Sequence, residues 1–106
     1  MNPAPNNIPG LSPQAAALLG AFCVGHRVST LRIYGSFVRN ELTPESDVDV
    51  LLEFQPGVDP DLFELGGMQQ ELSDIFDREV DLKTPEMFSP HNLRRVIASS
   101  VLAHAA

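Results

Sequence analysis

The segment from residue 47 to residue 54, Asp-Val-Asp-Val-Leu-Leu-Glu-Phe, constrains the fold of this chain most strongly. Its apolar side chains recur at every second position, which is typical of a β-strand with one face on a hydrophobic core. The opposite face begins with two carboxylates, Asp47 and Asp49, which lie on the same side of a strand because they are two residues apart. The segment therefore predicts a strand over residues 48–54 that contributes to both a core and a polar site.

Helices and strands are expected to alternate along the rest of the chain. Residues 28–34 and 79–83 are rich in strand-forming residues. A serine followed by proline favours a helix start, and it precedes expected helices at residues 12–24 and from 89 onward, the second with Val101 and Leu102 in its apolar stripe. Apolar residues at three- and four-residue spacing predict the longest helix from residue 61. We expect an α/β (α+β) fold with a small three-stranded mixed sheet covered by helices, its strand order left open.

Size and composition limit the classes of protein to which this chain can belong. The 106 residues fit one domain, residues 11–106, after a tail at residues 1–10 that we expect to be disordered because it is rich in proline and asparagine. A net charge of -7 opposes binding to duplex nucleic acid. The longest apolar run, residues 15–25, is shorter than the roughly 18 residues of a membrane span. With a single cysteine, Cys23, expected as a buried thiol, these features predict a cytoplasmic protein with no membrane partner.

A candidate phosphate and metal site lies around the second strand. Gly35 and Ser36 follow the first strand, and glycine lets a backbone approach a ligand while serine offers a hydroxyl and an N–H to phosphate oxygens. Asp47 and Asp49 can converge on one hard cation, and carboxylates without a histidine or cysteine cluster favour magnesium or manganese over zinc. Asp81 becomes a third carboxylate if its strand lies beside the second. Three carboxylates suit two metal ions, with Asp49 as the candidate bridge.

These residues also have purely structural interpretations. An isolated Asp-x-Asp is typical of a solvated turn that leads into a strand, and Ser36 fits a plain turn. An arginine in the position of Arg39 is more often a surface ion-pair partner of Glu41 or another acid than a nucleotide contact. Asp81 fits a charge that protects an edge strand. The Gly-Ser turn, ten residues before Asp47, favours the functional interpretation because the combination is far more specific than either part.

The whole pattern, Gly35-Ser36, ten residues, Asp47, one residue, Asp49 and then Asp81, resembles the signature of the nucleotidyltransferase superfamily that includes DNA polymerase beta. Within it, GSFVRNE and SDVDVLLEF are similar to the minimal nucleotidyltransferases, antitoxins paired with HEPN-domain toxins. The resemblance covers roughly residues 12–104 and implies a nucleotidyltransferase core. It also implies these roles: metal binding and catalysis by Asp47, Asp49 and Asp81, activation of the attacking hydroxyl by Asp81, and nucleotide binding by Gly35 and Ser36. Arg39 is a further candidate for nucleotide binding.

The resemblance implies a protein adenylyltransferase. Magnesium-bound ATP would give AMP to a hydroxyl of a cognate HEPN toxin, and the chain would act as its antitoxin, its acidic surface complementing a basic partner. Two other interpretations stay open. One is a non-catalytic antitoxin module that neutralises the toxin by occlusion. The other is a small-molecule nucleotidyltransferase, as in aminoglycoside-modifying enzymes, which usually add a substrate-binding domain.

Overall fold

The computed structural model describes residues 11–38 and 47–105. These residues form, in chain order, α1 (Pro13–Gly25), β1 (Val28–Tyr34), the 3-10 turn η1 (Gly35–Phe37), β2 (Val48–Phe54), α2 (Leu62–Phe76), β3 (Val80–Lys83), the 3-10 turn η2 (Pro85–Met87), α3 (Pro90–Ser99) and β4 (Val101–Ala105). The strands make one sheet in the order β3-β2-β1-β4. β1 is antiparallel to β2 and β4, whereas β2 is parallel to β3. The predicted fold class, a mixed sheet covered by helices, is confirmed.

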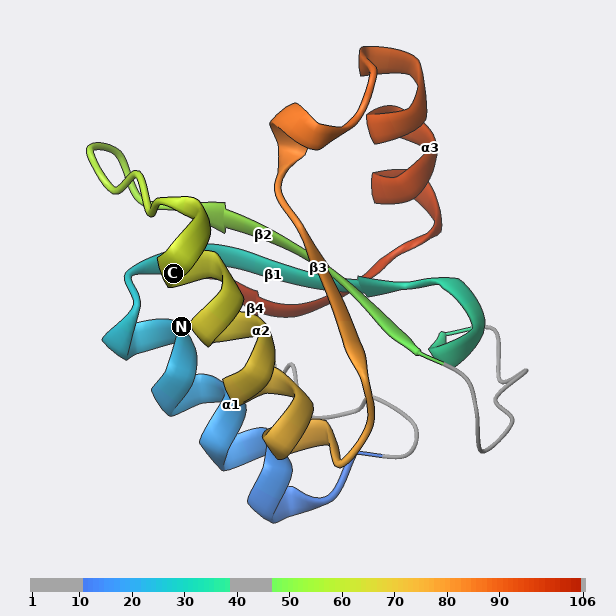
Figure 1. Ribbon diagram of the computed structural model, residues 1–106. Helices are drawn as coiled ribbons and strands as arrows, with labels where there is room; N and C mark the ends of the chain where they lie inside the picture. The colour runs from blue at the N-terminus through green and yellow to red at the C-terminus, as the bar shows by residue number, and fades with distance from the viewer. Residues whose placement is uncertain (1–10, 39–46, 106) are drawn as a thin grey trace.

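The helices lie on both sides of the sheet. α1 and α2 run side by side across one face, and α3 lies on the other (Figure 1). Strand alternation sends the apolar positions of β2 toward α1 and α2, where the buried core lies. The core draws on all four strands and both of these helices: Leu19, Phe22, Cys23, Val28, Leu31, Ile33, Val48, Val50, Leu52, Met68, Leu72, Val80, Leu82 and Ala103.

A side-chain cap begins each of the three helices, as the serine-proline pairs predicted for the first and the last. Ser12 precedes α1, and its hydroxyl accepts a hydrogen bond from the Ala15 N–H at 3.1 Å, while Ser89 caps α3 in the same way. Asp61 and Glu64 form a capping box at the start of α2, since each side chain accepts from the other residue's backbone N–H. These caps satisfy N–H groups that the first turn of a helix leaves without partners.

The C-terminal segment corrects the prediction of three strands. Val101 and Leu102, expected in the last helix, instead begin the fourth strand β4. The helix ends because Ser100 takes an extended backbone, and its hydroxyl donates to the Ile97 carbonyl at 2.7 Å, one of the carbonyls that the helix would otherwise use. The next residues then pair with the free edge of β1. The apolar spacing alone could not distinguish a longer helix from this strand.

Cys23 is fully buried in α1, as predicted, and burial raises the pKa of its thiol to about 12. The thiol is therefore protonated at neutral pH and serves as a small apolar group. None of the helices in the described part of the chain combines the length and hydrophobicity that crossing a membrane requires.

Candidate active site

The turn after β1 lies directly against a carboxylate of β2. Gly35 has a φ of +79°, a left-handed conformation that glycine adopts without strain. A Cβ at Gly35 would collide with Oδ2 of Asp49 and lie 3.3 Å from its Cγ. Glycine is thus required here both by its backbone conformation and by the close approach of Asp49. Ser36 follows in the turn η1, half-buried, so the predicted Gly-Ser turn and Asp49 are neighbours in space.

Asp49 and Asp81 lie opposite each other in neighbouring strands. β2 and β3 are parallel and in register at these two residues, so their half-buried side chains leave the same face of the sheet. Tyr34 pairs with Asp49 from the other side. We call the side of the sheet that carries Tyr34, Asp49 and Asp81 the carboxylate face. β3 lies beside β2, which is the arrangement that Asp81 needs to be a third carboxylate of the site.

The tyrosine shows the electrostatic character of this face. Burial, followed by the negative charges of Asp49 and Asp81, raises the pKa of Tyr34 to about 12. Its hydroxyl is therefore protonated at neutral pH and can donate a hydrogen bond. The Phe88 ring, just before α3, packs edge-on against it with ring centroids 6.3 Å apart. Sequence reasoning assigned no role to Tyr34, although its position immediately before Gly35 was the available signal.

Lys83 forms an ion pair within the site. Its Nζ lies 2.6 Å from Oδ2 of Asp81, with the lysine side chain 34% and the aspartate side chain 45% exposed. Both leave the carboxylate face because they are two residues apart in β3. The sequence left Lys83 without an assignment, and the structure gives it the role of partner to the third carboxylate. A cation that binds Asp81 has to compete with this ammonium group.

The remaining predicted site residues are placed less closely. Asp47 is exposed and directly precedes β2, and the two-residue period puts it on the side of Asp49. Over residues 11–38 and 47–105, no three histidine, cysteine or acidic side chains are grouped closely enough to hold a metal ion. Arg39 lies outside the described residues. The structure therefore brings together Gly35, Asp49 and Asp81 and leaves Asp47 at the exposed entrance of the strand.

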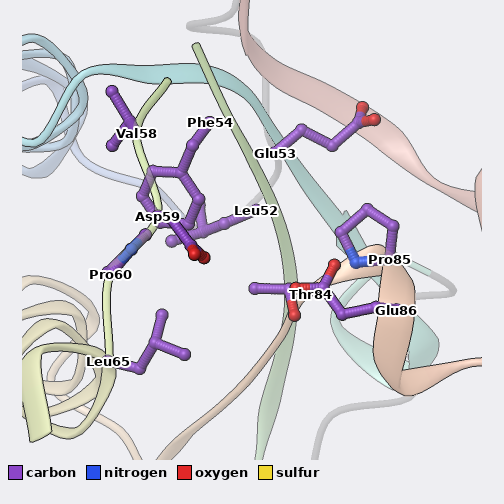
Figure 2. Close-up of a pocket in the computed structure, with 10 residues that line it drawn as sticks. All are labelled: Leu52, Glu53, Phe54, Val58, Asp59, Pro60, Leu65, Thr84, Pro85 and Glu86. Carbon is purple, nitrogen blue, oxygen red and sulfur yellow. The ribbon is translucent and has the colours of Figure 1, made fainter. Parts of the chain in front are cut away.

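A cavity of about 260 Å³ opens near the other end of β2 (Figure 2). Its walls include Leu52 and Phe54 of that strand, Asp59 of the following loop, and Thr84. The Thr84 hydroxyl is buried and has no hydrogen-bond partner among the described residues. Asp49 and Asp81 do not line this cavity, so it is separate from the carboxylate site.

Comparison with known proteins identifies the family. Residues 17–104 match the family model described as "Nucleotidyltransferase domain". The chain is 34% identical, over 72% of its length and 80% of the relative, to a protein of Methanocaldococcus jannaschii named "Putative protein adenylyltransferase MJ0435". This family match agrees with the resemblance inferred from the motif.

Two solved structures share the fold. One, described as "Structure of putative minimal nucleotidyltransferase", superposes with a TM-score of 0.69 at 24% identity and covers 82% of this chain and 86% of its own. The other, described as "Crystal structure of the toxin-antitoxin with AMP-PNP", has a TM-score of 0.72 at 15% identity and covers 86% of this chain and 73% of its own. At these identities the likeness establishes the fold alone.

Proposed function

The chain belongs to the nucleotidyltransferase domain family, and from this premise we propose that it is a magnesium-dependent adenylyltransferase that transfers AMP from ATP to a hydroxyl of a partner protein. The partner we propose is a HEPN-domain toxin in the cytoplasm, for which the chain serves as antitoxin. The relative named as a protein adenylyltransferase and the structural neighbour described as a toxin-antitoxin with AMP-PNP support this choice of reaction and partner.

One observation carries the proposal: the Gly35 turn, Asp49 and Asp81 meet on one face of the sheet. A turn with this backbone offers N–H groups to phosphate oxygens, and the two carboxylates beside it provide the negative charge that attracts cations. A site that only stabilised the fold would gain nothing from aligning two acidic side chains across neighbouring strands, since like charges directly opposite each other are destabilising.

The residues present fit magnesium. The donor atoms are carboxylate oxygens, which suit a hard cation, and the absence of a side chain at Gly35 lets the Asp49 carboxylate lie directly against the turn. Asp47 and Asp49 would hold the metal, with Asp81 joining them in a two-ion site. When bound, magnesium neutralises charge on the phosphates.

The chain's own residues then have separate tasks in the reaction. Backbone N–H groups of the Gly35 turn and the Ser36 hydroxyl hold the triphosphate. The acceptor oxygen forms a bond to the α-phosphorus, the bond from that phosphorus to the bridging oxygen breaks, and pyrophosphate leaves. The proton of the acceptor hydroxyl passes to the Asp81 carboxylate. Lys83 orients Asp81 through their 2.6 Å contact, and the protonated Tyr34 hydroxyl is available to donate a hydrogen bond to a ligand at the edge of the site.

A second candidate function is an antitoxin that works by occlusion without catalysis. The observation that favours it is the Lys83–Asp81 ion pair, which occupies one oxygen of the third carboxylate. If this pair persists when nucleotide binds, Asp81 is a weaker proton acceptor and metal ligand. The two candidates differ in whether neutralisation of the toxin depends on the carboxylates.

The experiment combines purified protein, its toxin partner, labelled ATP and magnesium, and follows label on the partner. The variant carries Asp47→Asn together with Asp49→Asn, and the matched control carries Asp59→Asn, an exposed acid outside the site. The proposal predicts transfer by the wild type and the control and none by the double variant. Unchanged transfer by the double variant contradicts the assigned roles, and neutralisation without any transfer supports occlusion.

A further inference from the structure

The outer side of α1 is apolar and open. The helix contains no charged residue from Pro13 to Gly25. Its core-facing side is filled by residues such as Phe22. The exposed side extends around the helix from Leu18, which is 56% exposed, through the exposed residues Ala21 and Ala17 to Val24, which is 73% exposed. A surface helix of a monomer normally presents polar residues on this side, so the pattern indicates a surface that something covers.

The middle of α2 carries two glycines that its own fold does not require. Gly66 and Gly67 lie in the middle of the helix and are exposed, and a Cβ at either position would meet nothing within 4 Å. Alanine is the better helix former, so each glycine weakens α2 without a packing reason inside the described chain. Gly67 lies on one stripe with Phe63, which is 90% exposed, and with Glu71. The missing side chain leaves room for the close approach of another backbone.

A groove runs between the two helices. It has a volume of about 420 Å³, and its α1 side is formed by Leu18, Ala21 and Gly25. Its α2 side carries Glu71 and Asp74. Among the described residues that line it, the one group able to carry positive charge is His26, whose Nε2 lies 3.0 Å from Oε1 of Glu71. The groove therefore has an apolar wall formed by α1 and an acidic wall formed by α2.

We propose that this groove, which we call the α1–α2 groove, binds an amphipathic helix of a protein partner that carries lysine or arginine along one flank. The apolar side of such a helix covers Leu18 and Ala21, and its basic flank faces Glu71 and Asp74. A second copy of this chain fits poorly, because a two-fold contact would bring the same acidic residues together between two chains of net charge -7.

The groove lies on the side of the sheet opposite the carboxylate face. The apolar positions of β2 point to α1 and α2, whereas Asp49 points away from them. Docking in the groove therefore leaves the carboxylate face open. The proposal does not depend on AMP transfer, because a protein partner can dock here whether the carboxylate face is catalytic or not.

The test uses a synthetic amphipathic peptide of leucine, alanine and lysine, about 18 residues long so that it can form a helix on binding. The controls are the same peptide with glutamate in place of lysine and a scrambled peptide without an apolar face. Binding is measured by isothermal titration calorimetry, and its place by amide chemical shifts. We expect saturable binding of the lysine peptide, with shifts on α1 and α2, and at least about tenfold weaker binding of both controls.

Three variants make the test specific. Gly67→Ala should raise the melting temperature by about 4 °C and weaken peptide binding at least about tenfold, a combination that a purely structural role of this glycine cannot produce. Leu18→Glu should also abolish binding, because Leu18 is exposed and lines the groove, whereas Met87→Glu, at an exposed apolar residue elsewhere, should not. Binding of magnesium and AMP-PNP should be the same in all three, which separates this result from the proposed function.

Two outcomes overturn the proposal. One is equal binding of the lysine peptide by wild type, Gly67→Ala and Leu18→Glu, or no preference for it over the glutamate and scrambled peptides. The other is self-association of the wild type, measured by light scattering, that Leu18→Glu removes, which assigns the groove to a second copy.

Discussion

Two neighbouring rows of residues cross the same three strands, and one packs in the core while the other forms the candidate site. The first row is paired across β1, β2 and β3 and is buried on the side covered by α1 and α2; it consists of Ile33, Val50 and Leu82. The next row is one residue away in every strand, and it consists of Tyr34, Asp49 and Asp81 on the carboxylate face. Because side chains alternate along a strand, one register places the first row in the core and the second at the site.

This comparison teaches that the site depends on the pairing of the strands as much as on the identity of its residues. A slip of one residue in β3 would bury Asp81 against α2 and expose Leu82. The apolar row therefore holds the carboxylates in position by specifying the register. Substitutions in the apolar row should therefore lower mainly the free energy of unfolding, and substitutions in the carboxylate row should lower mainly AMP transfer.

The largest effect is expected from Asp49→Asn. The variant keeps the shape of the side chain but removes the charge that lies beside the Gly35 turn, so AMP transfer should fall by about 10³-fold or more, comparable to the loss of other preorganised charge-stabilising groups. Its melting temperature should be equal or higher, since a repulsion with Asp81 is relieved. Transfer assays and thermal unfolding on the same sample check both parts. A large fall in stability would show that the row is structural.

Ile33→Ala should have the opposite profile. Ile33 is fully buried, and truncation leaves a cavity that costs about 3 kcal/mol of unfolding free energy. In a domain whose total stability is about 5–15 kcal/mol, this is a large fraction. Urea denaturation gives the loss, and transfer measured well below the midpoint should remain within a few-fold of wild type. Loss of activity in the folded variant would contradict the separation of the rows.

Gly35→Ala should affect both properties at once. The added Cβ meets a φ of +79° and the Asp49 carboxylate, so we expect a loss of about 2 kcal/mol from backbone strain. Displacement of Asp49 should also lower transfer about 100-fold, because small misplacements of a reacting group are costly. The control is Gly57→Ala, another glycine of positive φ but with open space around its Cβ, which should lose stability and keep activity. Equal activity in the two variants would contradict the close contact.

The smallest effect is expected from the titration of His104, a buried residue outside the carboxylate face. Burial lowers the pKa of His104 in β4 below its ordinary value of 6.5. Between the lowered value and 6.5 the unfolded chain binds the proton and the folded chain does not, so stability is full above 6.5 and declines as pH falls below it. Thermal unfolding of wild type and His104→Gln should run parallel above pH 7 and diverge below pH 6.5, with the variant losing less. Curves that stay parallel would exclude a buried neutral histidine.

The local elements were predictable from the sequence because their signals are local. The alternation in β2, the serine-proline pairs that begin at Ser12 and Ser89, and the apolar spacing after Asp61 predicted the strand and the three helix starts that the structure contains. β4 was missed because Val101 continues the apolar spacing of α3, and only the free edge of β1, distant in sequence, makes a strand the better partner.

The site was predictable in its residue types but not in its arrangement. The Gly35 turn and Asp49 follow from the spacing of the motif, whereas the neighbouring position of Asp81 depends on parallel pairing between β2 and β3, which no local pattern encodes. Lys83 could not be assigned, because an ammonium two residues from a carboxylate in a strand can face solvent, a phosphate or that carboxylate. The long-range packing selects among these.

Diffraction from crystals soaked with Mn²⁺ and AMP-PNP tests the central claim most directly, since manganese substitutes for magnesium and is located by its anomalous scattering. Our account predicts manganese bound to the carboxylates of Asp47, Asp49 and Asp81, with the triphosphate on the Gly35–Ser36 turn. Manganese and nucleotide bound together elsewhere, with the Lys83–Asp81 pair intact, would contradict it.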